Sequence, residues 1–105
     1  KVFIAAAGMA AHLAGAVAAH STKPVIGIPI ESGGMGGIDS LLSTAMMPPG
    51  VPVATVAVGK SGAKNSAILA VQILATGDDD LDQKLVEYKT NMRDEVLEKD
   101  RKLNS

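Results

Sequence analysis

His12 stands out among the residues of this 105-residue chain whose type and position could support chemistry. It follows the small-residue turn Ala5-Ala6-Ala7-Gly8 and lies near the start of an alanine-rich segment. An imidazole can exchange protons near neutral pH, and small residues let a ligand approach the backbone closely. A strand that ends here and continues as a helix leaves free N–H groups that can hold an anion or a polar ligand. The pattern predicts a ligand site around residues 5–15, with a partly buried histidine bonded to backbone groups as the alternative.

Other candidate motifs are weaker. Gly59-Lys60-Ser61 resembles the end of a phosphate-binding P-loop, but Ala54 stands where that motif needs a glycine. The glycine-rich stretch 33–37 contains no dinucleotide-binding fingerprint. His12 and His20 are eight residues apart with no carboxylate between them, so we expect no metal site. Four serines could bind a ligand, although serine is also an ordinary residue of loops and caps: Ser32, Ser40, Ser43 and Ser61.

The segments that must position these residues alternate between strands and helices. Apolar runs predict buried strands at 2–7, 25–30 and 51–58, with Pro29 at the end of its strand or at a sheet edge. Helices are predicted at 10–21, 38–46, 63–76 and 81–99, with loops at 31–37 and 59–62 and a turn at 47–50. This alternation indicates a parallel sheet with helices on its faces and right-handed crossovers.

Each of the last three predicted helices should gather its apolar residues on one side. The sets are Leu41, Leu42 and Ala45; Ala67, Ala70, Val71 and Leu74; and Leu81, Leu85, Tyr88, Met92 and Val96. The second set predicts a buried helix, with Gly77 just after its end. Asp78-Asp79-Asp80 place negative charge where the dipole of the last helix favours it.

Composition limits the class of protein. A net charge of −1 gives no sign of a nucleic-acid surface, and apolar stretches are too short for a membrane span. The chain has no cysteine, so a disulfide framework is excluded and a cytoplasmic location is expected. One domain, residues 1–105, is predicted. Its small residues and 2% aromatic content make a thin core, and a strand begins at residue 2. We therefore expect an oligomer, or the later part of a longer protein.

Five segments, in this order and spacing, carry a resemblance to a known family. They are Ala-Gly-Met-Ala-Ala-His-Leu-Ala-Gly at 7–15, Pro-Val-Ile-Gly-Ile-Pro-Ile at 24–30, Gly-Gly-Ile-Asp-Ser-Leu-Leu-Ser at 36–43, Met-Pro-Pro-Gly-Val-Pro-Val-Ala-Thr-Val-Ala at 47–57 and Ala-Lys-Asn-Ser-Ala-Ile-Leu-Ala at 63–70. Together they resemble the PurE family, the N5-carboxyaminoimidazole ribonucleotide mutases of purine biosynthesis. The Ala-Ala-His-Leu form resembles the bacterial mutase class rather than the class that uses free carbon dioxide.

The resemblance implies a three-layer, flavodoxin-like α/β fold with a long C-terminal helix, here without its N-terminal βα units. It also implies a homo-octamer with active sites between subunits, in which the last helix reaches over a neighbour. The substrate would be a small ribonucleotide, and the reaction would need no metal and no organic cofactor. His12 would be catalytic and in contact with the substrate. The other substrate-binding positions would be Ala6, Ala7, Gly8, Leu13 and Ser32.

The sequence also departs from the family pattern. The family usually has Gly at Ala6, Gly at Met9 and Pro at Ala14. Its Gly-Ser-x-Ser-Asp loop, which holds the ribose phosphate, and its Ser-Ala-His-Arg segment, which supplies the main catalytic histidine, do not occur here. We therefore expect the 105-residue chain alone to be inactive. A binding or structural module is the alternative, and a flavodoxin-like nucleotide binder is a weaker one because the candidate loops have no aromatic residue.

Overall fold

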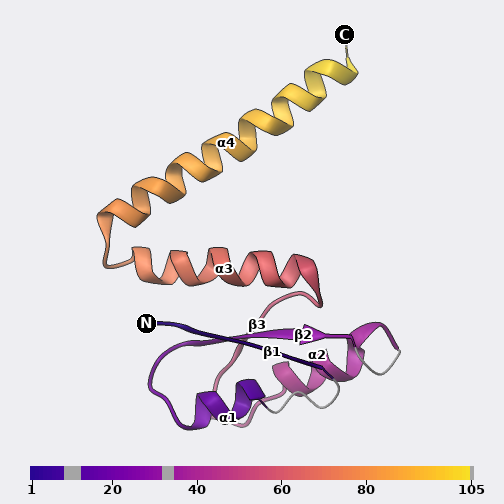
Figure 1. Cartoon of the computed structure of the whole chain (residues 1–105), viewed down its shortest axis with the longest axis vertical. Coiled ribbons are helices and arrows are strands. Elements are labelled where there is room, and N and C mark those ends of the chain that lie inside the picture. The colour runs from indigo at the N-terminus through magenta and orange to yellow at the C-terminus, as the bar shows by residue number, and fades with distance from the viewer. Residues whose placement is uncertain (9–12, 32–34, 105) are drawn as a thin grey trace. The chain divides into compact units, whose positions relative to one another are not determined.

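The computed structural model describes residues 1–8, 13–31 and 35–104 (Figure 1). The elements are β1 (Phe3–Gly8), α1 (Leu13–Ala19), β2 (Val25–Ile30), the 3₁₀ helix η1 (Met35–Gly37), α2 (Ile38–Ala45), β3 (Ala54–Thr55), α3 (Lys60–Ala75) and α4 (Asp79–Leu103). The chain divides into two compact units, Lys1–Ala70 and Val71–Ser105, and the division falls within α3. The predicted alternation of strands and helices is confirmed.

The first unit is built on a parallel sheet in the order β1-β2-β3. Six residues of β1 pair with six of β2, from Phe3 beside Val25 to Gly8 beside Ile30. The central strand β2 is a continuous apolar run, as expected for a strand buried on both faces. With helices flanking the sheet and a long helix at the C-terminal end, the architecture agrees with the predicted flavodoxin-like α/β fold.

The third strand is much shorter than the predicted 51–58, because only Ala54 and Thr55 pair with β2. Pro29 supplies the physical reason. Gly59 N–H donates to the Pro29 carbonyl at 3.0 Å, so the backbone of Pro29 faces the side of β2 on which β3 lies. Proline has no N–H group, so the hydrogen bonding between β2 and β3 is interrupted at this residue. Pro29 therefore lies inside the central strand, fully buried, and the prediction that it marks a strand end or a sheet edge was wrong.

β1 has the predicted position, but the prediction that it is buried was wrong. Phe3 and Ile4 are 42% and 46% exposed, and Ala5 is the only buried residue of the strand. β1 has a neighbouring strand on one side only among the described residues, whereas β2 is flanked on both sides. Ile26, in the middle of β2, is correspondingly 0% exposed.

The core of the first unit lies between the sheet and helices α1 and α2, which lie on the same side of the sheet (Figure 1). Its buried cluster is Ala5, Ala14 and Val25, so the predicted small-residue core is confirmed. At Gly27 of β2, side chains of α2 and of the segment before β3 pack directly against the strand. A Cβ built there would lie 2.4 Å from Thr44 Cγ2 and 2.9 Å from Val53 Cγ1.

Ile26 and Ile28 point to the opposite face of β2, because side chains alternate along a strand. They are 0% and 7% exposed, so this face is covered as well. Figure 1 shows the first part of α3, residues 60–70, on this side of the sheet. Helices therefore flank both faces of the central strand.

The buried faces of α2 and α3 differ from those predicted. In α2, Leu41 and Leu42 are exposed, and the buried side chains are Ser40 and Thr44. Only small side chains fit there, because α2 approaches β2 closely at Gly27. In α3, the predicted buried face was also wrong, because Ala67 is exposed and Leu74 is 40% exposed, whereas Ser66 and Ala75 are buried.

The boundaries of α3 also differ from the prediction. The helix begins at Lys60 rather than at residue 63, because Ala63 N–H already donates to the Gly59 carbonyl at 2.9 Å. It ends in tightened turns, in which Gly77 N–H donates to Leu74 O at 3.2 Å. Gly77 does not have the positive φ that the predicted C′ position usually adopts.

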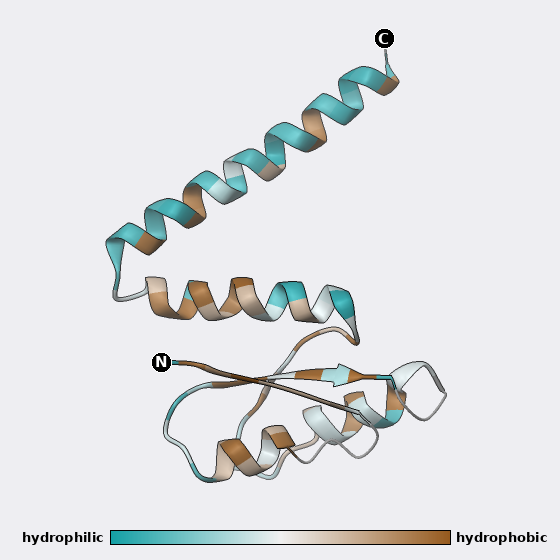
Figure 2. Ribbon diagram, in the orientation of Figure 1, coloured by the Kyte–Doolittle hydropathy of each residue, from teal (hydrophilic) through white to brown (hydrophobic). Residues whose placement is uncertain are grey.

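The second unit contains the end of α3 and the whole of α4. Asp78 caps α4 by accepting a hydrogen bond from Leu81 N at 3.1 Å, so the predicted acidic start is confirmed. No residue of α4 is buried, and its surface is mostly hydrophilic with apolar bands (Figure 2). Along the predicted stripe, Met92 and Val96 are 49% and 65% exposed. Among the described residues, no helix is long and apolar enough to cross a membrane.

Candidate functional site

The predicted site lies where the parallel strands end. Gly8 and Ile30 are the last residues of β1 and β2, and they pair with each other. Adjacent strands are about 4.8 Å apart, so the last residues of β1 and β2 lie side by side. In open α/β sheets, ligands bind outside this carboxyl edge.

Two buried hydroxyl groups fasten α2 to this edge. Ser40 Oγ donates to the Ile30 carbonyl at 2.8 Å, and Thr44 Oγ1 donates to the Ser40 carbonyl at 2.7 Å. Their side chains are 1% and 2% exposed. A buried hydroxyl with a partner holds its acceptor in place, because breaking the bond leaves polar groups without compensation. The first turn of α2 is therefore fixed to the end of β2.

The two ends of loop 31–37 come close together. Gly36 and Gly37 have φ values of 65° and 84°, in the left-handed region that favours glycine. A Cβ built on Gly37 would lie 2.6 Å from Val58 Cγ1 and 3.6 Å from the Cα of Glu31. The end of β2, the start of α2 and the segment before α3 therefore meet at one place.

The structure describes four of the six predicted substrate-binding residues. Ala6, Ala7 and Gly8 form the end of β1, where Ala6 is exposed and the other two are half-buried. Leu13 is the first residue of α1 and is 52% exposed. The other two, His12 and Ser32, lie outside the described residues. The structure thus brings Gly8 beside Ile30, and the roles given to these six residues stay predictions.

Sequence reasoning missed the structural role of Ser40, which it counted only among four serines able to bind a ligand. Ser40 bonds to the backbone of β2, whereas Ser43 is half-buried and Ser61 is exposed at the start of α3. The available signal was the Ser40–Thr44 pair, two small polar residues four apart in α2. Such residues share one helix face.

Charged side chains near this edge are exposed, and they include Glu31, Asp39 and Lys60. Within the described ranges, no group of three or more His, Cys, Asp or Glu residues is arranged to hold a metal ion. The arrangement offers instead the small residues at the end of β1, Ala6, Ala7 and Gly8. These suit a neutral or anionic small molecule that approaches the backbone closely.

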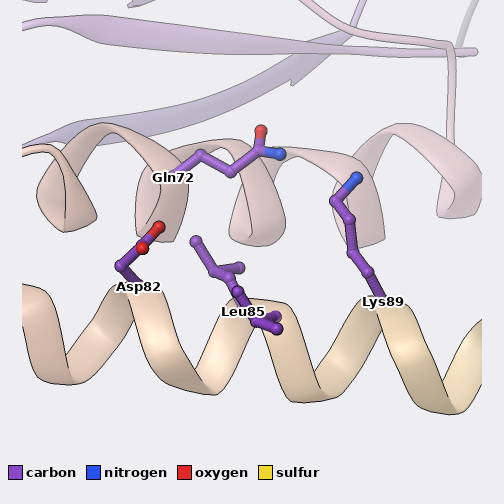
Figure 3. Close-up of a pocket in the computed structure, with 5 residues that line it drawn as sticks. Gln72, Asp82, Leu85 and Lys89 are labelled. Carbon is purple, nitrogen blue, oxygen red and sulfur yellow. The ribbon is translucent and has the colours of Figure 1, made fainter.

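A separate pocket lies within the second unit (Figure 3). It has a volume of about 260 Å³ and is lined by Gln72 of α3 and by Asp82, Leu85, Val86 and Lys89 of α4. It is open and falls below the range of about 300–1,000 Å³ that is usual for small-molecule sites. The four predicted substrate-binding residues that the structure describes do not line it, so we do not assign the ligand site to it.

Comparison with known proteins points to a single family. The model of the AIR carboxylase family matches residues 1–95. The chain is 52% identical over 98 residues to the N5-carboxyaminoimidazole ribonucleotide mutase of Escherichia coli K12, covering 93% of this chain and 58% of that protein. The proteins of the same name from Bacillus subtilis 168 and Methanocaldococcus jannaschii are 55% and 49% identical, covering 93% and 97% of this chain and 60% and 63% of the relatives.

The chain thus spans about 58–63% of the length of these curated relatives. The matched part includes every element from β1 to most of α4.

Proposed function

The chain belongs to the AIR carboxylase family, and from this premise we propose that it is part of an N5-carboxyaminoimidazole ribonucleotide mutase of purine biosynthesis. The observation that carries the proposal is the family match over residues 1–95, supported by relatives of that name at about half identity. Such an enzyme is an isomerase that interconverts N5-carboxyaminoimidazole ribonucleotide and 4-carboxy-5-aminoimidazole ribonucleotide.

The reaction moves one carboxylate within the substrate. The bond between N5 and the carboxylate carbon breaks, N5 takes a proton, and carbon dioxide is released into the site. C4 of the imidazole then attacks that carbon dioxide, and the proton on C4 is removed. A positioned acid/base group can serve both proton transfers. A closed site is needed to keep carbon dioxide from diffusing away before C4 attacks.

We assign the wall of this site to the end of β1 and the residues after it. Ala6, Ala7 and Gly8 are small enough to let the imidazole and carbon dioxide approach the backbone. His12 contacts the carboxylate or the imidazole, and Leu13 and Ser32 complete the contacts. The pairing of Gly8 with Ile30 supports this assignment, since it brings the exits of β1 and β2 to one place.

We further propose a homo-octamer in the cytoplasm, with each site completed by a neighbouring subunit. Five large apolar residues of α4 are exposed, namely Val86, Met92, Val96, Leu97 and Leu103. Their burial against a neighbouring subunit would be favourable, which supports an oligomer. The absence of cysteine is in keeping with a reducing compartment.

The proposal is tested by supplying either ribonucleotide and following its conversion into the other by chromatography. The 105-residue chain should be assayed alone and after the N-terminal segment of the Escherichia coli relative has been placed before residue 1. We expect no turnover by the chain alone and turnover by the longer protein, because the phosphate-binding and principal histidine motifs of the family do not occur in these 105 residues. A folded longer protein without turnover would contradict the proposal.

A further inference from the structure

We propose that Ser40 is a positioning residue of the ribonucleotide site, which fixes the place where the chain leaves β2 and enters loop 31–37. The identity of the ligand in this inference rests on the proposed function. The positioning itself rests on the geometry around Ile30, so the two can be tested separately.

The carbonyl of Ile30 lies at the end of β2, beside the end of β1. Phe3 N–H donates to Pro24 O at 2.9 Å, and the register continues in parallel to Gly8 beside Ile30. In this register, the N–H groups of alternate β1 residues bond to β2 carbonyls two residues apart. β1 ends at Gly8, which lies beside Ile30. The carbonyl of Ile30 accepts a hydrogen bond from Ser40 Oγ at 2.8 Å.

The second step is the support beneath Ser40. Thr44 Oγ1 donates to the Ser40 carbonyl at 2.7 Å, and the Thr44 methyl group occupies the space beside Gly27 of β2, 2.4 Å from where a Cβ on that residue would lie. Both side chains are almost completely buried. The hydroxyl of Ser40 is therefore held on a rigid turn of helix and does not sample solvent.

The third step connects Ser40 to the loop. Gly37 precedes α2 by one residue, and the Cα of Glu31 lies 3.6 Å from where a Gly37 Cβ would be. Ile30 directly precedes the loop, and Ser40 lies three residues after its last residue, Gly37. The hydrogen bond from Ser40 to Ile30 therefore closes the loop at its base. Loop 31–37 carries the predicted contact residue Ser32. This closure fixes where the described ends of the loop, Glu31 and Gly37, lie at the end of β2.

Removal of the hydroxyl should therefore loosen the base of the loop and weaken substrate binding more than the chemical step. Misplacement of a contact by about 1 Å can reduce enzymatic rate by up to about 100-fold. For a positioning residue remote from the reacting atoms, we expect a rise in KM of about fivefold or more with kcat changed less than threefold. Substitution of a residue with only a structural role would lower the amount of folded protein, without raising KM more than it changes kcat.

The test compares Ser40→Ala with Ser66→Ala, a matched control. Ser66 is also 1% exposed, and its Oγ donates to the Ala63 carbonyl at 2.7 Å, within α3 and away from the loop base. Hydrogen exchange of the peptide covering residues 29–40 is measured on the 105-residue chain without ligand. KM and kcat are measured on the protein of full family length. Ser40→Thr, which keeps the hydroxyl, provides the rescue.

We expect exchange in residues 29–40 to rise at least tenfold in Ser40→Ala, to change less than twofold in Ser66→Ala, and to return toward wild type in Ser40→Thr. Equal exchange in Ser40→Ala and wild type, or equal rises in Ser40→Ala and Ser66→Ala, would overturn the positioning role. Faster exchange in Ser40→Ala, with a wild-type protein that turns over neither ribonucleotide, would leave the positioning in place and refute the proposed function instead.

Discussion

Substitution of Gly27 by alanine tests the packing that places α1 and α2 on the central strand. The added methyl group would lie 2.4 Å from Thr44 Cγ2, 2.9 Å from Val53 Cγ1 and 3.3 Å from Ala14 Cβ. The first two distances are too short for carbon atoms, which are in optimal contact at about 3.5–4.0 Å. Ala14 and Thr44 are 3% and 2% exposed, so neither neighbour can move into solvent.

Overpacking of this kind in a well-filled core lowers the free energy of unfolding by about 1–3 kcal/mol, and we expect about 2 kcal/mol for Gly27→Ala. Thr44→Ser removes the nearest methyl group and keeps the hydroxyl that bonds to the Ser40 carbonyl. On its own, this change should lose about 1 kcal/mol, as for one buried methyl group. Because it makes room for the new Cβ, the double variant should lose about 1.5 kcal/mol, rather than the roughly 3 kcal/mol expected from independent effects.

Urea unfolding, followed by far-ultraviolet circular dichroism, gives these free energies for the wild type and the variants. Gly77→Ala is the control, because no atom lies within 4 Å of a Cβ built there and its φ is not positive. It should be neutral or stabilising by up to about 1 kcal/mol. If Gly27→Ala were as stable as wild type, or if the effects at 27 and 44 simply added, α2 would not pack on β2 as described.

Three further predictions concern the second unit and the site. Asp78→Ala should lower the free energy of unfolding by about 1 kcal/mol, because Leu81 N–H loses its capping acceptor; a thermal-unfolding midpoint equal to that of wild type would show that the cap contributes nothing. Deletion of residues 81–105 should disassemble the proposed oligomer, which light scattering on both forms would detect, and a stable monomer of the undeleted protein would refute the oligomer itself. In the protein of full family length, His12→Ala should lower turnover more than tenfold, about 1.4 kcal/mol of transition-state stabilisation, and an unchanged rate would assign His12 a purely structural role.

The parallel sheet could be predicted because its signals are local. Val25–Ile30 is continuous and β-branched, and strands that alternate with helices leave few topologies open. The length of β3 could not be predicted in the same way. It depends on which side of β2 the backbone of Pro29 faces, and this follows from the sheet register rather than from the local pattern.

The faces of the helices were the least predictable feature. Periodicity selects large apolar residues such as Leu41 and Leu42, whereas the close approach at Gly27 selects small ones, Ser40 and Thr44. The candidate site could be located at the ends of β1 and β2 from the strand–turn–helix pattern around Gly8. The hydroxyl that closes the base of loop 31–37 could not, because Ser40 and Ile30 are ten residues apart in the chain.

The central claim, that this chain is part of a mutase, is tested most directly by the fate of the carboxylate carbon. N5-carboxyaminoimidazole ribonucleotide labelled with ¹³C in its carboxylate is given to the protein of full family length in the presence of excess unlabelled bicarbonate. The product is then analysed by ¹³C nuclear magnetic resonance. We predict 4-carboxy-5-aminoimidazole ribonucleotide that retains the label, because carbon dioxide stays in the site between its release from N5 and its attack by C4. Product whose carboxylate is unlabelled would contradict the account and indicate carboxylation by free carbon dioxide.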